Sequence, residues 1–117
     1  HTSQFTPGKN FAATGGFGPW MMTKDEIGDL SQMELTTRLN GEVMQNATAA
    51  LMVHSFEELI EFCSTWIELE PGDVIVTGTP GGVGAARTPP VFMQDGDRIE
   101  IEVTPIGKLV NPIVAES

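Results

Sequence analysis

A glycine-dense loop is the segment of this sequence whose residues could most directly bind a ligand. It spans residues 77–84, reads Thr-Gly-Thr-Pro-Gly-Gly-Val-Gly, and follows the short apolar run at residues 74–76. Glycines let a backbone approach a ligand closely and aim its N–H groups at an anion. A phosphate loop needs Gly-Lys-Ser/Thr at its end, and a dinucleotide site needs a helix where this sequence has Pro89 and Pro90. The residues therefore indicate either an anion-binding loop outside the nucleotide classes or, equally, a tight glycine turn without a ligand.

Lys9 is the second residue with a possible chemical role. It lies in the stretch Gly-Lys-Asn-Phe at residues 8–11. Beside a carboxylate or a bound oxyanion, a lysine can steer an acidic substrate or stabilise developing negative charge. A lysine next to a glycine is more often a solvated loop residue, so the stretch alone leaves both interpretations open.

The acidic residues do not predict a self-contained metal site. A hard cation needs two or three converging oxygen ligands, usually from carboxylates. Here the acids fall in predicted turns, beside glycines, or on the predicted solvent face of a strand, where local reasons explain them. The candidates are Asp25, Glu26, Asp29, Glu68, Glu70, Asp95, Asp97, Glu100 and Glu102. We therefore expect no metal site built from this chain alone.

Nucleophilic catalysis finds little support. Cys63 falls on the apolar stripe of a predicted helix, where a packed thiol is expected rather than a reactive one. His54 directly precedes the helix cap and His1 is terminal, and neither has a recognisable serine or cysteine partner in the sequence. No catalytic triad is predicted.

Two regular elements are indicated by local patterns. Residues 34–45 alternate apolar and polar side chains on either side of Asn40-Gly41, which predicts a β-hairpin because both turn residues tolerate positive φ. Residues 55–67 begin with Ser55 and Glu58, the spacing of a capping box, and continue with apolar residues at intervals of three and four. This pattern predicts an amphipathic helix whose apolar stripe faces a core.

The remaining patterns are those of strands and turns. Residues 74–76 form an unbroken apolar run that predicts a short buried strand. Residues 98–103 alternate cleanly after the turn Asp-Gly-Asp at 95–97, and residues 109–114 give a last strand that Asn111-Pro112 places at an edge or interrupts. The predicted fold class is α+β, rich in β, with one amphipathic helix.

Length and charge narrow the function classes. At 117 residues the chain is at most one domain with one modest core. Sixteen acids against six bases give a net charge of −10, which argues against a nucleic-acid partner. No apolar run approaches the roughly 20 residues of a membrane span. With a single cysteine and no signal sequence at the start, we expect a cytoplasmic protein without a membrane partner.

Six segments, taken in order, carry a resemblance that covers nearly the whole chain. They are Gly8-Lys9-Asn10-Phe11, Phe17-Gly18-Pro19-Trp20, Leu39-Asn40-Gly41-Glu42 with Gln45, Leu69-Glu70-Pro71-Gly72-Asp73-Val74-Ile75, Thr77-Gly78-Thr79-Pro80-Gly81-Gly82-Val83-Gly84 and Asp95-Gly96-Asp97. Together they resemble the fumarylacetoacetate hydrolase family over about residues 5–114. The Pro-Gly-Asp segment running into Thr-Gly-Thr-Pro is the most specific of them, and the sequence of residues 10–20 is most similar to members that act on diacids of the homoprotocatechuate pathway.

The resemblance implies a fold, a chemistry and site residues. The fold would be part of a mixed β-roll, usually a homodimer or higher oligomer. Members hydrolyse, decarboxylate or isomerise small 2-oxo acids and acylpyruvates in aromatic or organic-acid catabolism, with Mg²⁺ or Mn²⁺ chelated by the substrate. The family's active-site lysine falls on Lys9. Its substrate-contacting threonine falls on Thr79, with Gly78 beside it in the loop.

The family's metal-binding Glu-x-Glu and Asp lie upstream of the Gly-Lys motif, before the first residue of this sequence. The expectation is therefore a single partial domain over residues 1–117, the C-terminal part of a catalytic domain, inactive without the upstream ligands. Whether the chain itself is an enzyme stays open at this point. The alternative is a non-enzymatic remnant that acts as an oligomerising or binding module.

Overall fold

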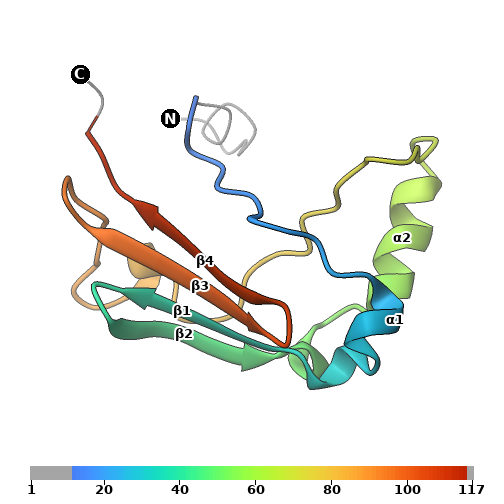
Figure 1. Cartoon of the computed structure of the whole chain (residues 1–117), viewed down its shortest axis with the longest axis horizontal. Helices are drawn as coiled ribbons and strands as arrows, with labels where there is room; N and C mark the ends of the chain where they lie inside the picture. Colours follow the sequence, from blue (N-terminus) through green and yellow to red (C-terminus); the bar gives the residue numbers. More distant parts are fainter. Residues whose placement is uncertain (1–11, 116–117) are drawn as a thin grey trace.

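An antiparallel four-stranded sheet dominates the computed structural model, which describes residues 12–115 (Figure 1). The strand order is β2-β1-β3-β4, and every neighbouring pair is antiparallel. The strands are β1 (Glu34–Leu39), β2 (Glu42–Thr48), β3 (Arg98–Thr104) and β4 (Gly107–Pro112). The predicted α+β, β-rich class is confirmed.

The predicted hairpin is present as β1 and β2. Asn40 and Gly41 form its turn with φ of 52° and 88°, the left-handed values that this pair tolerates. The register shifts once, because Thr37 pairs with Gln45 while Arg38 pairs with Val43. Met44 is thus an extra residue on β2, and this β-bulge leaves it without a partner on β1.

The two faces of the sheet differ in polarity, since paired residues on neighbouring strands share a face. One face carries Leu35 with Val103, and Ile101 with Leu109, in register. Extended chain lies against this face: Trp20 donates from Nε1 to the carbonyl of Ile106 at 2.8 Å. The opposite face carries a row of charged residues, namely Arg38, Arg98, Glu100, Glu102 and Lys108.

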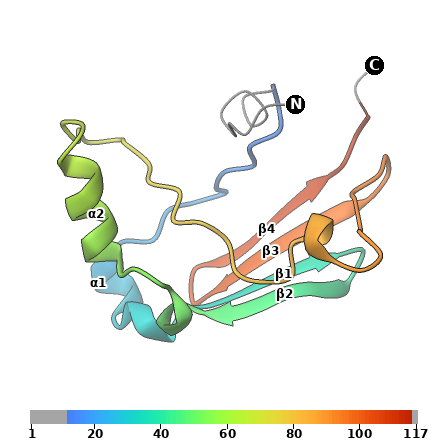
Figure 2. The same ribbon diagram turned by 180° about the vertical axis from the view of Figure 1, so that it is seen from behind.

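Helices α1 and α2 lie at one end of the sheet rather than on either face, as the two opposite views show (Figures 1 and 2). Helix α2 begins after Ser55, whose hydroxyl accepts from Glu58 N, while the Glu58 carboxylate accepts from Ser55 N. The predicted capping box is confirmed. The helical segments are α1 (Lys24–Ile27), η2 (Leu30–Gln32), η3 (Ala49–Leu51), α2 (Phe56–Ser64) and η4 (Gly84–Ala86).

The modest core predicted from chain length is not formed by residues 12–115. No apolar side chain among them is buried, and the buried residues are Thr36, Thr37 and Glu100. The accessible surface is 9495 Å², whereas an independent globular protein of this mass exposes about 6,200 Å². The described chain is therefore far from closing a core by its own contacts.

The predicted burial of the α2 stripe is also wrong. Phe56, Leu59 and Cys63 are half-buried, but Trp66 is 76% exposed and Ile60 is 51% exposed. The physical reason is position: among residues 12–115, extensive contacts between elements join only neighbouring strands and the pair η2–η3. The helix therefore has an apolar stripe that the described chain covers only in part.

The buried strand predicted at residues 74–76 is absent. This segment is extended but forms no ladder in the described chain, with Val74 59% and Val76 87% exposed. An apolar run of this kind forms a strand only when it pairs with another strand, and it pairs with none of the four described strands.

The last strand, predicted over residues 109–114, is β4 at Gly107–Pro112, and it has the edge position that was one of the two possibilities. β4 pairs only with β3 and ends at Pro112, whose lack of an N–H is tolerated at an edge. In the part of the chain that the structure describes, no helix has both the length and the apolarity needed to cross a membrane.

Candidate functional site

The chain returns from the α2 end of the molecule to the sheet through the glycine loop (Figure 2), in which Gly78 and Thr79 are exposed. Gly78 has φ of 99°, a value that favours glycine. Both residues line a cavity of about 420 Å³ whose other walls are mainly apolar. These walls come from β1, β2, η3, α2 and β3 and include Leu35, Ala47, Met52, Phe56, Leu59 and Val103.

A glutamine from the sheet holds the loop at Thr79. Gln45 Nε2 lies 2.9 Å from Thr79 Oγ1 and 2.9 Å from the carbonyl oxygen of Pro80. Gln45 pairs with Thr37. Its side chain therefore extends from the largely apolar face of the sheet, and its amide reaches the loop from that face. Two hydrogen bonds from one amide group fix the loop at two successive residues.

Arg87 also holds the loop, at the point where the loop passes the β-bulge. Arg87 Nη2 donates to the carbonyl of Met44 at 2.7 Å, and Arg87 Nε donates to the carbonyl of Gly82 at 3.3 Å. Gly82 has φ of 98°, and a Cβ at this position would collide with the Met44 carbonyl oxygen. The Met44 carbonyl thus accepts a hydrogen bond from a charged group, and only glycine fits at position 82 beside this carbonyl.

The loop keeps backbone donors available. The N–H groups of Gly78 and Thr79 donate to no acceptor within residues 12–115. Exposed and unpaired N–H groups next to a hydroxyl are the components of a small anion site. The loop can therefore offer hydrogen-bond donors to an anion from its backbone and its hydroxyl group, without a basic side chain.

Several of the carboxylates that the sequence offers as metal ligands are engaged in local structure instead. Glu26 closes the cap of α1 by accepting from Thr23, and Asp29 accepts from Ser31 N at 3.0 Å. Asp97 accepts from Asn40 Nδ2, and this hydrogen bond lowers the pKa of the Asp97 carboxyl. Within residues 12–115, no three histidine, cysteine, aspartate or glutamate side chains gather. The described residues do not fit a divalent cation.

Glu100 and Glu102 lie on the same face of β3, as predicted, but Glu100 is buried there rather than exposed to solvent. It is 7% exposed and lies between Arg98, with which it forms an ion pair, and Lys108 Nζ at 3.1 Å. The hydrogen bond from Lys108 lowers the pKa of the Glu100 carboxyl, against the opposing effect of burial. This cluster is an ion-pair network across β3 and β4, and it has no open ligand position in the described chain.

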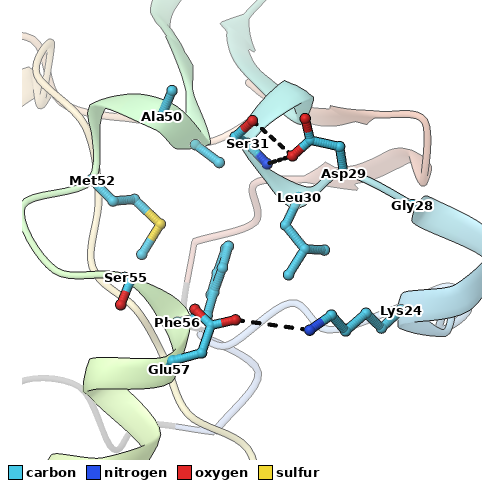
Figure 3. A pocket seen from close by; sticks show the side chains of 11 residues that line it. Lys24, Gly28, Asp29, Leu30, Ser31, Ala50, Met52, Ser55, Phe56 and Glu57 are labelled. Carbon is cyan, nitrogen blue, oxygen red and sulfur yellow. Dashed lines mark hydrogen bonds and ion pairs between the residues drawn. The ribbon is translucent and has the colours of Figure 1, made fainter.

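A second cavity, of about 470 Å³, opens between the helical segments (Figure 3). Leu30, Met52 and Phe56 extend into it, and its charged groups already have partners. Lys24 Nζ lies 3.8 Å from Glu57 Oε1, and Asp29 is bonded to Ser31. The cavity lies between α1, η2, η3 and α2, and none of the predicted site residues lines it.

The other predicted residues lie away from the glycine loop or outside the described chain. Lys9 lies outside the described residues. Cys63 is half-buried on α2, which agrees with a packed thiol. His54 Nδ1 lies 3.9 Å from Glu58 Oε2, and His54 also lines the apolar cavity. Of the predicted site, the structure thus describes Gly78 and Thr79, which are neighbours in the sequence.

Gln45 and Arg87 are the residues that the sequence patterns do not identify as functional. Gln45 appears there only as part of a motif, and nothing singles out Arg87. One signal is available for Gln45: it is a polar residue at a position where alternation along the hairpin calls for an apolar one. Nothing local distinguishes Arg87, because its acceptor on Met44 lies 43 positions away.

Comparison with known proteins gives a consistent result. The profile described as "Fumarylacetoacetate (FAA) hydrolase C-terminal" matches residues 1–114. The mitochondrial oxaloacetate tautomerase FAHD2A of Bos taurus is 42% identical over 111 residues, which are 95% of this chain and 35% of that protein. The chain thus spans about a third of the length of such curated relatives.

Solved structures agree in fold. A fumarylacetoacetate hydrolase from Exiguobacterium antarcticum matches with a TM-score of 0.92 and 40% identity, over 97% of this chain and 40% of that one. Maleylpyruvate hydrolase from Sphingobium sp. SYK-6, in complex with manganese(II) and pyruvate, matches with a TM-score of 0.76 and 34% identity, over 86% and 35%. The resemblance to diacid-pathway members is confirmed by a 2-hydroxyhepta-2,4-diene-1,7-dioate isomerase from Mycobacterium marinum, with a TM-score of 0.70 and 41% identity over 83% and 34%.

Proposed function

The chain belongs to the fumarylacetoacetate hydrolase family, and on this premise we propose that it supplies the carboxylate-binding side of an active site for a small 2-oxo acid. The observation that carries the proposal is the glycine loop, where the hydroxyl of Thr79 and the N–H groups of Gly78 and Thr79 lie exposed at the edge of an apolar cavity. Hydrogen-bond donors fixed in this way can bind the carboxylate and stabilise an enolate that develops beside it.

The reaction that we propose first is isomerisation, the keto–enol tautomerisation of a 2-oxo diacid. Relatives at about 42% identity are oxaloacetate tautomerases, and solved members with similar folds are named as isomerases and hydrolases. Hydrolysis of an acylpyruvate, and loss of CO₂ from the distal carboxylate of a 2-oxo diacid such as oxaloacetate, also pass through an enolate next to a carboxylate. The chain's donors would serve any of the three.

A divalent cation, Mg²⁺ or Mn²⁺, belongs to this proposal, with ligands outside residues 12–115. It would supply Lewis-acid chemistry when bound, and manganese is present in the related maleylpyruvate hydrolase. What this chain's own residues do is bind and orient: Gly78 permits the turn, Thr79 donates to the substrate, and Lys9 places positive charge beside it. The acidic chain offers few other cations for that task, with six lysines and arginines against sixteen acids.

The cellular setting and the assembly stay predictions. We propose a homodimer or higher oligomer as the working form and a single partial catalytic domain over residues 1–117. The sequence predicts a cytoplasmic protein, while several relatives are named as mitochondrial.

The test compares variants of the full-length natural polypeptide in a tautomerase assay with oxaloacetate and a hydrolase assay with an acylpyruvate. Thr79→Val removes the hydroxyl at nearly constant volume, and Lys9→Ala removes the charge. Each is expected to lower turnover by roughly 10² to 10³, the magnitude usual for a lost oxyanion contact.

Thr88→Val is the matched control, because Thr88 is exposed and makes none of the loop's hydrogen bonds. Its kinetics should equal those of the wild type. If Thr79→Val and Lys9→Ala also leave the kinetics unchanged, the proposed site is wrong.

A non-enzymatic binding or assembly module is the second candidate. The observation in its favour is the large uncovered apolar surface, together with the absence of a metal-ligand cluster in residues 12–115. A full-length protein that stays folded and oligomeric but turns over no 2-oxo acid with either Mg²⁺ or Mn²⁺ would support this candidate over the enzyme.

A further inference from the structure

We infer that Gln45 is a positioning residue that fixes the hydroxyl of Thr79 as a hydrogen-bond donor toward the bound carboxylate. The inference rests on the proposed function of Thr79. Its own evidence is the pair of contacts that one amide nitrogen makes, 2.9 Å to Thr79 Oγ1 and 2.9 Å to the Pro80 carbonyl oxygen.

The orientation of the Gln45 amide follows from the nature of Pro80. A carbonyl oxygen can only accept a hydrogen bond, so the Gln45 atom that lies beside it must be the –NH₂ group. An –NH₂ group has two hydrogens and no acceptor capacity. One hydrogen is used on Pro80 O, and the other is directed at Thr79 Oγ1.

The direction of the Thr79 hydrogen bond then follows as well. Because Gln45 Nε2 can only donate, Thr79 Oγ1 must accept from it, and the hydroxyl hydrogen has to point elsewhere. Within residues 12–115, Thr79 Oγ1 donates to no acceptor. The free hydroxyl hydrogen of the exposed Thr79 is therefore available to an anion on the open side of the loop.

A threonine hydroxyl without such a neighbour can rotate and present either a lone pair or its hydrogen to a ligand. Presenting the lone pair to a carboxylate is repulsive, whereas donating to it forms a charge-assisted hydrogen bond. Accepting one hydrogen bond also polarises the hydroxyl and strengthens the bond that it donates. Gln45 thus selects the useful orientation before the substrate arrives.

The β-bulge explains why the amide reaches the loop. Side chains alternate between faces along a strand, so the extra residue Met44 decides the face on which Gln45 lies. Arg87 binds the Met44 carbonyl at 2.7 Å, which stabilises the bulge from the loop side. The bulge, Gln45 and Arg87 therefore form one connected support beneath Thr79.

Substitutions of Gln45 in the full-length natural polypeptide test the inference by reversing the direction of the hydrogen bond between residue 45 and Thr79. Gln45→Glu keeps the size, but the carboxylate accepts the Thr79 hydrogen and repels the Pro80 carbonyl. Gln45→Met keeps the length and does neither. The kcat/KM for a 2-oxo acid should fall in the order wild type, Gln45→Met, Gln45→Glu, with Gln45→Glu lower than wild type by at least about tenfold.

Two further readouts separate positioning from mere structural support. Acidification should restore part of the relative activity of Gln45→Glu, because the protonated carboxyl can donate to Thr79 as the amide does. In a double-mutant cycle, Gln45→Glu should cost less once Thr79→Val is present than it does in the wild type, because only its repulsion of the Pro80 carbonyl then remains. Melting temperatures of all the variants should show that each one is folded at the assay temperature.

The outcomes distinguish this inference from the proposed function. If Thr79→Val lowers kcat/KM but Gln45→Glu does not, or if their effects multiply independently at every pH, the role of Gln45 is wrong and that of Thr79 stands. If Thr79→Val behaves like Thr88→Val, the proposed function itself fails.

Discussion

At the residue scale, the chemistry available to this chain is that of hydrogen-bond donors. Thr79 and its neighbouring N–H groups are exposed, while several of the described carboxylates are engaged in caps, turns and ion pairs. Thr79 could be proposed from the sequence because its motif resembles that of a family. The contact that Gln45 makes with it could not, because the two residues are 34 positions apart and their meeting depends on a bulge.

The ion pairs of Glu100 predict a pH dependence of stability. The hydrogen bond from Lys108 lowers the pKa of Glu100 in the folded state. A carboxyl with a lowered folded pKa stabilises the fold above its unfolded pKa, and this contribution is lost as the pH falls through the folded value. We therefore expect the melting temperature of the wild type to fall more steeply below about pH 4.5 than that of Glu100→Gln.

Glu61→Gln is the control for this experiment, since Glu61 is exposed on α2 and forms no ion pair with another described residue. Differential scanning calorimetry of the three proteins between about pH 7 and pH 3 makes the measurement. Parallel curves for wild type and Glu100→Gln would show that the ion-pair network does not contribute in this way.

At the element scale, local signals succeeded where the interaction is local. The Asn-Gly hairpin and the capping box of α2 are set by residues within a few positions of each other, and both are present. The strand expected at residues 74–76 is absent because a strand requires a partner, and sequence alternation says nothing about where that partner lies. The same reasoning applies to the uncovered stripe of α2.

The glycine loop provides a prediction at this scale. Gly82→Ala should destabilise the protein, because alanine at positive φ costs about 1–2 kcal/mol and its Cβ would press on the Met44 carbonyl. The loop would have to move away from β2, and Thr79 would move with it. The melting temperature and the kcat/KM should both fall.

Gly81→Ala is the matched control for stability, since its backbone is not in the left-handed region and no atom lies within 4 Å of the position that an alanine Cβ would take there. Thermal unfolding of the two variants side by side makes the comparison. Equal melting temperatures would mean that the close approach of Gly82 to the bulge does not constrain the loop.

At the scale of the whole molecule, the described chain is extended and open. Its radius of gyration is 15.7 Å, against about 13.4 Å for a compact domain of this length. Exposed apolar side chains on α2 and at residues 74–76 add to unpaired backbone along the edge strands. Surfaces of this kind associate with each other or with another part of a protein.

The 117-residue chain on its own should therefore self-associate. Sedimentation velocity over a range of concentrations should show a weight-average mass that rises with concentration, and a dye specific for apolar surface should bind. A clean, stable monomer at high concentration would contradict the view that residues 12–115 need further contacts.

The most direct test of the central claim is a crystal structure of the full-length natural polypeptide with pyruvate bound. We predict that the pyruvate carboxylate lies within about 3 Å of Thr79 Oγ1, with Gln45 Nε2 still bonded to that oxygen. A well-ordered pyruvate bound away from the glycine loop would contradict the claim that this chain supplies the carboxylate-binding side of the active site.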